Sequence, residues 1–313
     1  MDARAIEKVL RSMPEATDQM KEQRLAAYLG ERKRLTRLAY RYLGSVSEAE
    51  DAVQDAWLRF ADAEAPEDAG RYLSRIVTNL CLDRLKSASR RRETYVGPWL
   101  PEPIVAQAGT TDPEAGDAAL DISFGIMRAL ELLSPLERAA LFLHDLYDVP
   151  FEEIAETLKR SPAACRQLAS RARKTLQQAN PRFHPTESDV SRYVAGFTET
   201  ARTGSIEPLK QILAADVEFI SDGGGKVPAA RDVLSGFDMV AGFLVVIAQK
   251  FQPPERTRFQ PVSVNGEPGL VLVVDGKIEQ TMSFALDEHG AINGIYIVRN
   301  PDKLSGIEPP AKG

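Results

Sequence analysis

The most chemically informative stretch of the chain is residues 151–176, "FEEIAETLKRSPAACRQLASRARKTL". Two short amphipathic segments separated at Ser161 and Pro162 predict a helix-turn-helix. Arginine and glutamine can pair with base edges, and lysine and arginine neutralise phosphates. We therefore expect a duplex-DNA surface on the second helix, formed by Ser161, Ala163, Arg166, Gln167, Ser170, Arg171, Arg173 and Lys174. A solvated amphipathic helix pair is the alternative.

The inner face of the same motif is apolar, with small residues where the helices must cross. Ile154, Ala155 and Leu158 are expected to face inward on the first helix. Cys165, Leu168 and Ala172 are expected to do so on the second helix, so Cys165 is interpreted as a packing residue rather than a redox sensor.

Charge is distributed unevenly along a chain whose formal net charge is −6. Residues 71–92 hold seven Lys/Arg against the single acid Asp83, and residues 159–174 hold six Lys/Arg and no acid. Residues 46–68 hold eight acids and one base, Arg59. Two basic stripes on an acidic chain are the pattern that favours contact with phosphate backbones, although a charge run can also be a solvated helix face.

Composition indicates the cellular compartment and whether a metal site is expected. The 313 residues include 43% hydrophobic and 27% charged residues, as in ordinary globular proteins, and no apolar run approaches a membrane span. The N-terminus lacks the features of a secretory signal. Cys81 and Cys165 are the only cysteines, and neither belongs to a metal-binding pattern. We expect a cytoplasmic protein without metal or cofactor.

Helical periodicity, linkers and alternation divide the chain into several domains. Helices are predicted through 1–92, with a stop at Gly44 and a capping box opening at Ser47. An α+β domain with a curled antiparallel sheet is predicted near the C-terminus, with hairpin turns at Asp275-Gly276 and His289-Gly290. The expected ranges are an N-terminal helical extension at 1–25, a helical domain at 26–92, a linker at 93–118, a second helical domain at 119–180, a short linker at 181–187, an α+β domain at 188–304 and a tail at 305–313.

Three pentapeptides and two helical blocks carry a family resemblance. "AEDAVQDAWLRF" with "GRYLSRIVTNLCLDRLKS" resembles region 2 of bacterial extracytoplasmic-function (ECF) sigma factors, and residues 119–180 resemble their region 4. "WLPEP" (99–103), "DGGGK" (222–226) and "NPDKL" (300–304) are together similar to the ECF group with a fused SnoaL-like C-terminal domain. The implied fold is all-α region 2 and helix-turn-helix region 4, followed by an α+β SnoaL-like cone.

The resemblance implies partners for each region. Region 2 is expected to dock on the β′ clamp helices of core RNA polymerase, and region 4 is expected to meet the β flap and the −35 DNA. The core polymerase-binding residues would be Asp51, Gln54, Asp55 and Leu58. An acidic helix with apolar residues suits a basic partner, although a core helix with a solvated face fits the same pattern.

The −10 DNA surface is implied by the same resemblance. Its residues would be Arg71, Arg75, Asn79, Asp83, Arg84 and Lys86, with further cations at Arg90, Arg91 and Arg92. Amide and carboxylate groups suit the edge of a base flipped from the duplex, and nearby cations suit the strand backbone. Asp83 could instead be an intrahelical partner of Arg84 or Lys86.

The third domain could bind, pack or catalyse. Some SnoaL-like relatives use Asp or His as a general base, and the candidates here are Asp222, Asp275, Asp287 and His289. The last three lie in predicted turns, so exposure is expected rather than a buried catalytic site. The inward strand positions look apolar: Val262, Val264, Leu270, Leu272, Met282, Phe284, Ile295 and Ile297. We therefore expect no enzymatic activity; a small ligand of this domain, if it binds one, remains unidentified.

The glycine run 222–226 does not match a phosphate-binding loop, because Lys226 is followed by Val227 and the glycine spacing is wrong. A plain turn is one interpretation. The resemblance suggests a contact loop instead, in which a tethered domain regulates the sigma regions through Trp99, Leu100, Pro101, Glu102, Pro103, Asp222, Gly223, Gly224, Gly225, Lys226, Asn300, Pro301, Asp302, Lys303 and Leu304. Trp99 and Leu100 would be buried by docking, and Lys226 could pair with a carboxylate such as Glu102.

The sequence thus predicts an ECF-type sigma factor for RNA polymerase with a built-in regulatory domain. The alternatives are a one-component helix-turn-helix regulator whose SnoaL-like domain senses a small ligand, and a fused isomerase.

Overall fold

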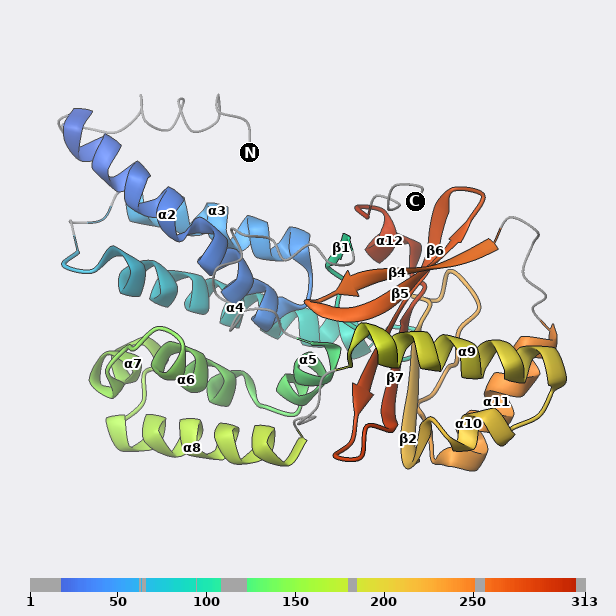
Figure 1. Cartoon of the computed structure of the whole chain (residues 1–313). Coiled ribbons are helices and arrows are strands. Elements are labelled where there is room, and N and C mark those ends of the chain that lie inside the picture. The colour runs from blue at the N-terminus through green and yellow to red at the C-terminus, as the bar shows by residue number, and fades with distance from the viewer. Residues whose placement is uncertain are drawn as a thin grey trace. The chain divides into compact units, whose positions relative to one another are not determined.

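The computed structural model describes residues 18–61, 63, 66–93, 95–107, 123–179, 185–250 and 257–307. Its contacts group the chain into two compact units, Met1–Arg90 with Leu133–Thr175, and Arg91–Leu132 with Leu176–Gly313. No helix within the described ranges has the length and apolar character that crossing a membrane requires. The first unit is helical and the second is built on a sheet (Figure 1).

The first unit begins with α2 (Asp18–Leu43), α3 (Val46–Ala61) and α4 (Ala69–Glu93). The predicted stop at Gly44 is confirmed, since this residue has φ +68° and its N–H donates to the Tyr40 carbonyl at 2.7 Å. The predicted cap at Ser47 is wrong by two residues: α3 begins at Val46, and the Ser45 hydroxyl accepts from the Glu48 N–H. The rings of Tyr28 and Trp57, 5.0 Å apart, join α2 to α3 in the core.

The second half of this unit contains α6 (Pro135–Asp145), α7 (Phe151–Leu158) and α8 (Pro162–Ala179). Ser134 caps α6 in a complete capping box with Glu137. Between α7 and α8 the chain turns at Lys159, whose φ of +53° places it in the left-handed region. Such a turn after a two-turn helix is the backbone geometry of a helix-turn-helix.

The second unit contains a mixed sheet. Its described strands are β1 (Val105–Gln107), β2 (Leu213–Asp222), β3 (Leu234–Ser235), β4 (Thr257–Val264), β5 (Glu267–Val274), β6 (Lys277–Leu286) and β7 (Ile292–Val298), in the order β1-β4-β5-β6-β7-β2-β3. Both predicted hairpin turns are present. The predicted antiparallel pairing holds for the other strand pairs and is wrong at one place, because β2 pairs with β7 in parallel.

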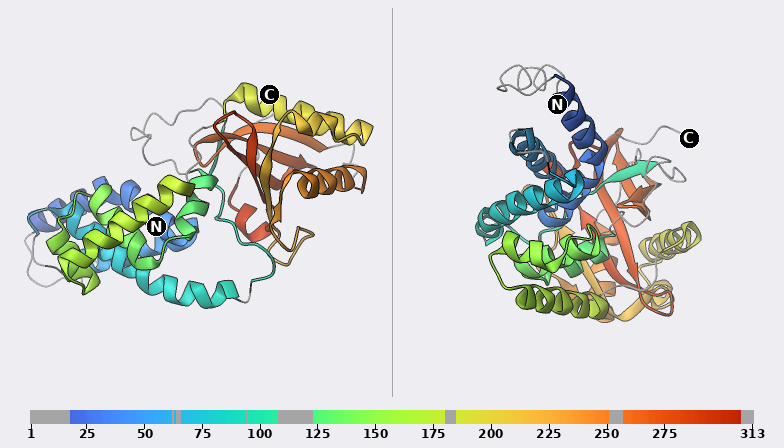
Figure 2. Two further views of the ribbon diagram at one scale, coloured as in Figure 1. Left: turned by 90° about the horizontal axis from the view of Figure 1, so that it is seen from below. Right: turned by 90° about the vertical axis from the view of Figure 1, so that its left-hand side faces the viewer.

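Helices cover both faces of this sheet (Figure 2). On one face lie α9 (Glu187–Thr203), α10 (Glu207–Lys210) and α11 (Phe237–Lys250). Side chains of α9 and α11 pack there with Phe284, Ile295 and other residues of one apolar cluster. The opposite face is covered by α5 (Phe124–Glu131) and α12 (Pro301–Leu304), both of which contact β6.

The register of β4 corrects the predicted inward face. Val262 lies opposite Gly269 and Pro261 opposite Leu270, so Val262 and Val264 face the side of α5 and α12, not that of Leu270. A shift of one residue reverses every side chain of a strand. The sequence pattern misled here because strands buried on both faces lack a clean alternation.

Candidate functional site

Asp222 is the centre of the contact between the linker and the sheet unit. Its side chain is fully buried and its carboxylate accepts four hydrogen bonds, from the Tyr95 hydroxyl (2.6 Å), the Leu100 N–H (2.9 Å), the Gly224 N–H (3.0 Å) and Lys303 Nζ (2.7 Å). A buried carboxylate is stable only when its oxygens are bonded and its charge is balanced, and both conditions hold here.

Lys303 supplies the balancing charge and also touches the linker. Its ammonium group bonds to the Leu100 carbonyl and lies 4.3 Å from the centre of the Trp99 ring. The Tyr95 ring centre is 5.2 Å away. Only 13% of the Lys303 side chain is exposed, so this cation serves the linker contact rather than solvent.

Asn300 ties the third pentapeptide to the other two. It caps α12 by accepting from the Asp302 N–H, and its amide donates to the Tyr95 hydroxyl at 2.8 Å. The backbone N–H groups of Arg299 and Asn300 both donate to the Asp222 carbonyl, at 2.7 and 2.9 Å. Residues 95–100, 222–226 and 300–304 therefore form one hydrogen-bonded group, which we call the linker dock.

The glycine run is a close-contact loop within the linker dock. Gly224 and Gly225 have φ angles of +62° and +71°. A Cβ on Gly224 would stand 2.4 Å from Nδ2 of Asn300, and one on Gly225 would stand 3.0 Å from Cβ of Val96. Glycine is required at both positions by backbone conformation and by space.

Lys226 does not have the partner that we suggested. Its ammonium group bonds both carboxylate oxygens of Asp302, at 2.7 and 2.6 Å, whereas Glu102 was the expected partner. The pair links the glycine loop to α12 and is exposed on both sides, 53% for Lys226 and 64% for Asp302. The sequence analysis placed Asp302 in the same contact region, but the sequence does not reveal which acid of that region reaches Lys226.

The apolar part of the linker covers the sheet. Leu100 is 1% exposed, and Pro101 and Pro103 are buried. Leu100 belongs to a cluster with Phe124, Ile220, Val271, Tyr296 and Leu304. Further along, β1 pairs with β4 in antiparallel register, and the Ile104 N–H donates to the Asn265 side chain at 2.9 Å. Residues 95–107 are thus a folded part of the sheet unit.

Tyr95 is a member of the linker dock that the sequence analysis missed. Burial raises the pKa of its phenol, and the hydrogen bond to the Asp222 carboxylate raises it further. Tyr95 therefore stays a neutral donor to Asp222. An aromatic residue just ahead of the proline-rich segment was the signal that could have identified it.

The expected −35 surface lies on the outer side of the helix-turn-helix. Ser161, Ala163, Arg166, Gln167, Ser170, Arg171 and Lys174 are exposed and Arg173 is half-buried. Ala169, which the sequence analysis did not place inward, is fully buried beside Cys165 and Ala172, whereas Leu168 is half-buried. Arg166 pairs with Glu152 at 3.0 Å, and Arg173 Nε donates to Asp145 at 2.8 Å.

The expected −10 surface on α4 contains two arginines held by acids. Arg75 contacts Glu153 and Glu156 of α7, whereas Arg84 bonds Asp55 at 2.6 Å and the Glu48 carbonyl at 2.8 Å. The other expected members with described side chains are Arg71, which pairs with Asp68 at 3.4 Å, the half-buried Asn79 and the exposed Asp83. The side chains of Lys86, Arg90, Arg91 and Arg92 lie outside the described residues.

The expected polymerase surface lies on the outer face of α3. Asp51 and Leu58 are exposed, Gln54 and Asp55 are half-buried, and the spacing of the four places them on one side of the helix. Leu58 is 48% exposed, whereas Val53, Trp57 and Phe60 of the same helix are buried. Asp55 links this surface to the −10 surface through Arg84.

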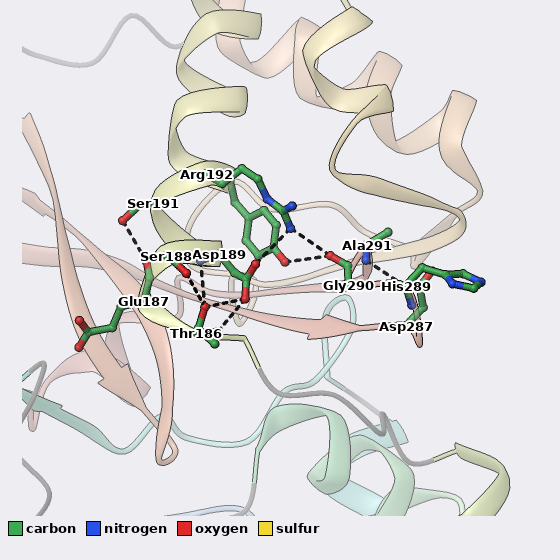
Figure 3. A network of polar contacts seen from close by, with 11 residues as sticks. Thr186, Glu187, Ser188, Asp189, Ser191, Arg192, Asp287, His289, Gly290 and Ala291 are labelled. Carbon is green, nitrogen blue, oxygen red and sulfur yellow. Dashed lines mark hydrogen bonds and ion pairs between the residues drawn. The ribbon is translucent and has the colours of Figure 1, made fainter.

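The candidate catalytic residues do not converge. Asp287 Oδ1 accepts from the N–H groups of His289 and Ala291, at 2.8 and 2.9 Å, so it stabilises the β6–β7 turn. Figure 3 shows the His289 ring pointing away from this polar network, and its side chain is 80% exposed. Asp275 lies in the β5–β6 turn and is exposed, and Asp222 is occupied in the linker dock.

Comparison with known proteins identifies the helical regions. Residues 27–91 match the family model "Sigma-70 region 2", and residues 123–176 match "Sigma-70, region 4". The matched region 4 includes α5, which packs on the sheet of the second unit.

Whole-length relatives agree. The ECF RNA polymerase sigma factor SigJ of Mycobacterium tuberculosis is 38% identical over 285 residues, covering 88% of this chain and 91% of SigJ. The probable ECF sigma factor SigI of the same species is 28% identical and covers 92% of this chain and 97% of SigI. The crystal structure of M. tuberculosis SigJ has a TM-score of 0.71 at 36% identity, over 91% of this chain and 99% of that one. The expected fold is thereby confirmed, and the chain belongs to the ECF RNA polymerase sigma factors.

Proposed function

We propose that this chain directs promoter-specific transcription initiation as a sigma subunit whose C-terminal domain restrains it through the linker dock. Region 2 would bind the β′ clamp helices of core polymerase through Asp51, Gln54, Asp55 and Leu58 on α3. The outward position of these four side chains on one side of α3 supports this assignment, because an acidic surface suits a basic partner.

The DNA contacts follow from the two basic surfaces. Region 4 would read the −35 element with the outward side chains of α8, Arg166 and Gln167 among them, and would meet the β flap. Region 2 would open and hold the −10 element with α4, where Asn79 and Asp83 offer groups for a flipped base. Five of the expected DNA-binding arginines pair with acids in this DNA-free structure, so DNA phosphates would have to replace those acids.

The buried Asp222 network is the observation that carries the regulatory part. Tyr95 begins the docked segment two residues after the end of α4, and Phe124 begins the helix α5 that packs on the same sheet face. Both ends of the segment between regions 2 and 4 are therefore anchored on one domain. If regions 2 and 4 must move apart to bind polymerase, the docked linker would limit that movement until residues 95–107 leave the sheet.

We further propose that the C-terminal domain has no catalytic role. Its candidate residues Asp275, Asp287 and His289 lie in turns, and Asp222 is bonded within the linker dock. Among the described side chains, no group of three or more His, Cys, Asp or Glu is placed to hold a metal ion. The chain would act in the cytoplasm, where it meets polymerase and the chromosome.

The test of the sigma activity uses the full-length protein and core polymerase from the organism that encodes it. Transcription of fragmented genomic DNA, followed by mapping of RNA 5′ ends, should give discrete start sites that core polymerase alone does not give. Start sites identical to those of core alone, with no co-purification of the chain with core, would contradict the proposal and favour a regulator that binds duplex DNA by itself.

A further inference from the structure

Arg75 of α4 is held by the first helix of the helix-turn-helix. Its guanidinium Nε donates to Thr157 Oγ1 at 2.9 Å, and its two terminal nitrogens lie 3.1 Å from Glu153 Oε2 and 3.3 Å from Glu156 Oε2. All these groups belong to one compact unit. Three directions of the planar guanidinium are thus occupied by α7, and a guanidinium engaged in this way is not available to a DNA phosphate.

The same unit contains a second set of contacts between the two regions. Arg34 of α2 donates to the Leu146 carbonyl at 2.9 Å and lies 4.1 Å from the centre of the Tyr147 ring. Arg138 of α6 donates to the Tyr42 carbonyl at 2.9 Å, and the rings of Tyr42 and Phe142 meet edge to face at 5.1 Å. Region 2 and region 4 are therefore packed together by buried groups, and Arg75 lies at the exposed side of that packing.

Exposure distinguishes the two sets of contacts. Tyr42, Phe142 and Arg138 are buried, whereas the side chains of Arg75, Glu153 and Glu156 are 27%, 37% and 73% exposed. Ion pairs that solvent reaches are weak and sensitive to salt. This part of the contact can open without unfolding a core, as a reversible restraint must.

We propose that Glu153 and Glu156 form an acidic clasp that occupies Arg75 in the place of −10 phosphate groups and holds region 4 against region 2. The inference rests on the proposed function, since it assumes that α4 carries the −10 surface. The two carboxylates bond the terminal nitrogens of the Arg75 guanidinium, which are the donors that would otherwise bond phosphate oxygens. Promoter DNA and the clasp compete for the same side chain, so the clasp restrains DNA binding in a second place, independent of the linker dock.

The first readout is the reactivity of Arg75 in the full-length protein. Phenylglyoxal modification followed by peptide mass spectrometry measures how available each arginine is. In the variant E153Q/E156Q the rate at Arg75 should rise about threefold to tenfold, because two partly exposed pairs are lost. The modification rate at Arg71 should not change, because its partner Asp68 lies directly before α4 and is not altered in this variant.

A matched control lies on the same helix. Glu152 pairs with Arg166 at 3.0 Å, whereas the acids on Arg75 are Glu153 and Glu156, so E152Q should raise the reactivity of Arg166 and leave Arg75 unchanged. The single variant E156Q removes a side chain that is 73% exposed and tests the clasp even where the double variant folds poorly. An unchanged Arg75 rate in both E156Q and a folded E153Q/E156Q would overturn the clasp.

The second readout is the association rate with core polymerase. E153Q/E156Q should associate about threefold or more faster than the wild type at low salt, with the difference shrinking at high salt. Equal rates, with wild-type binding intact, would overturn the restraint and leave the sigma assignment standing. Failure of the wild type to bind core would contradict the proposed function instead, while Arg75 reactivity would still decide whether the clasp exists.

Discussion

At the residue scale, Asp222 and Lys303 distinguish a buried pair from a surface pair. Asp222→Asn removes the charge that balances Lys303, and breaking a buried pair from one side typically costs about 3–5 kcal/mol. Hydrogen exchange in residues 95–107 should therefore become much faster. Asp302→Asn is the control, because its partner Lys226 is exposed and the pair should contribute about 1 kcal/mol or less. Equal protection in the two variants would show that Asp222 does not hold the linker.

Gly224 allows the close contact between the glycine loop and Asn300 to be tested through thermal stability. Gly224→Ala places a methyl group 2.4 Å from the Asn300 amide on a backbone with φ +62°, so it should lower the melting temperature of the sheet unit by several degrees. Gly276→Ala has a similar φ of +79° but open space around the new Cβ, and isolates the cost of the backbone conformation alone. A melting temperature for Gly224→Ala no lower than that for Gly276→Ala would contradict the close contact with Asn300.

At the scale of elements, the linker adds the strand β1 to the sheet and packs Leu100 into its apolar cluster. Leu100→Ala should destabilise the sheet unit by about 2–5 kcal/mol, because a fully buried leucine leaves a cavity when truncated. Ile104→Ala, four residues later and 46% exposed, should change stability by less than about 1 kcal/mol. Urea denaturation followed by circular dichroism checks both. Similar midpoints for the two variants would mean that the linker is not packed on the sheet.

Among the helices and strands, the sequence predicted the helix-turn-helix well and the strand pairing poorly. The helix-turn-helix was predictable because Ile154, Ala155 and Leu158 are all buried at helical spacing and the break at Ser161 is explicit. The parallel pairing of β2 with β7 was not, since strands distant in sequence carry no turn signal between them.

The candidate site was predictable only in part. The pentapeptides named nearly all of the residues that meet in the linker dock, but they did not include Tyr95 or indicate that Lys226 pairs with Asp302. The packing of α5 on the sheet and the contacts of Arg75 with α7 were also not predicted. Packing of a helix on a distant sheet, or of an arginine on a distant helix, depends on tertiary contacts that periodicity does not encode.

At the scale of the whole molecule, the linker dock and the acidic clasp are the two restraints that we propose for the sigma regions. A sigma subunit must present region 2 and region 4 to polymerase and promoter together, and here the segment that joins them is folded into a third domain. The tether makes the local concentration of the regulator high without a separate protein, so docking of 95–107 can be strong although only a few side chains carry it. Release then depends on breaking the Asp222 network.

We propose that docking of the linker on Asp222 restrains initiation, and in vitro transcription with core polymerase measures this restraint. Wild type, Asp222→Asn and Asp302→Asn would be compared on a template carrying a mapped start site, at equal protein and saturating core. We predict that all three bind core and that Asp222→Asn initiates several-fold more often, with Asp302→Asn within about twofold of wild type. If Asp222→Asn initiates no more often than wild type although hydrogen exchange shows that its linker is released, then docking of the linker does not restrain initiation.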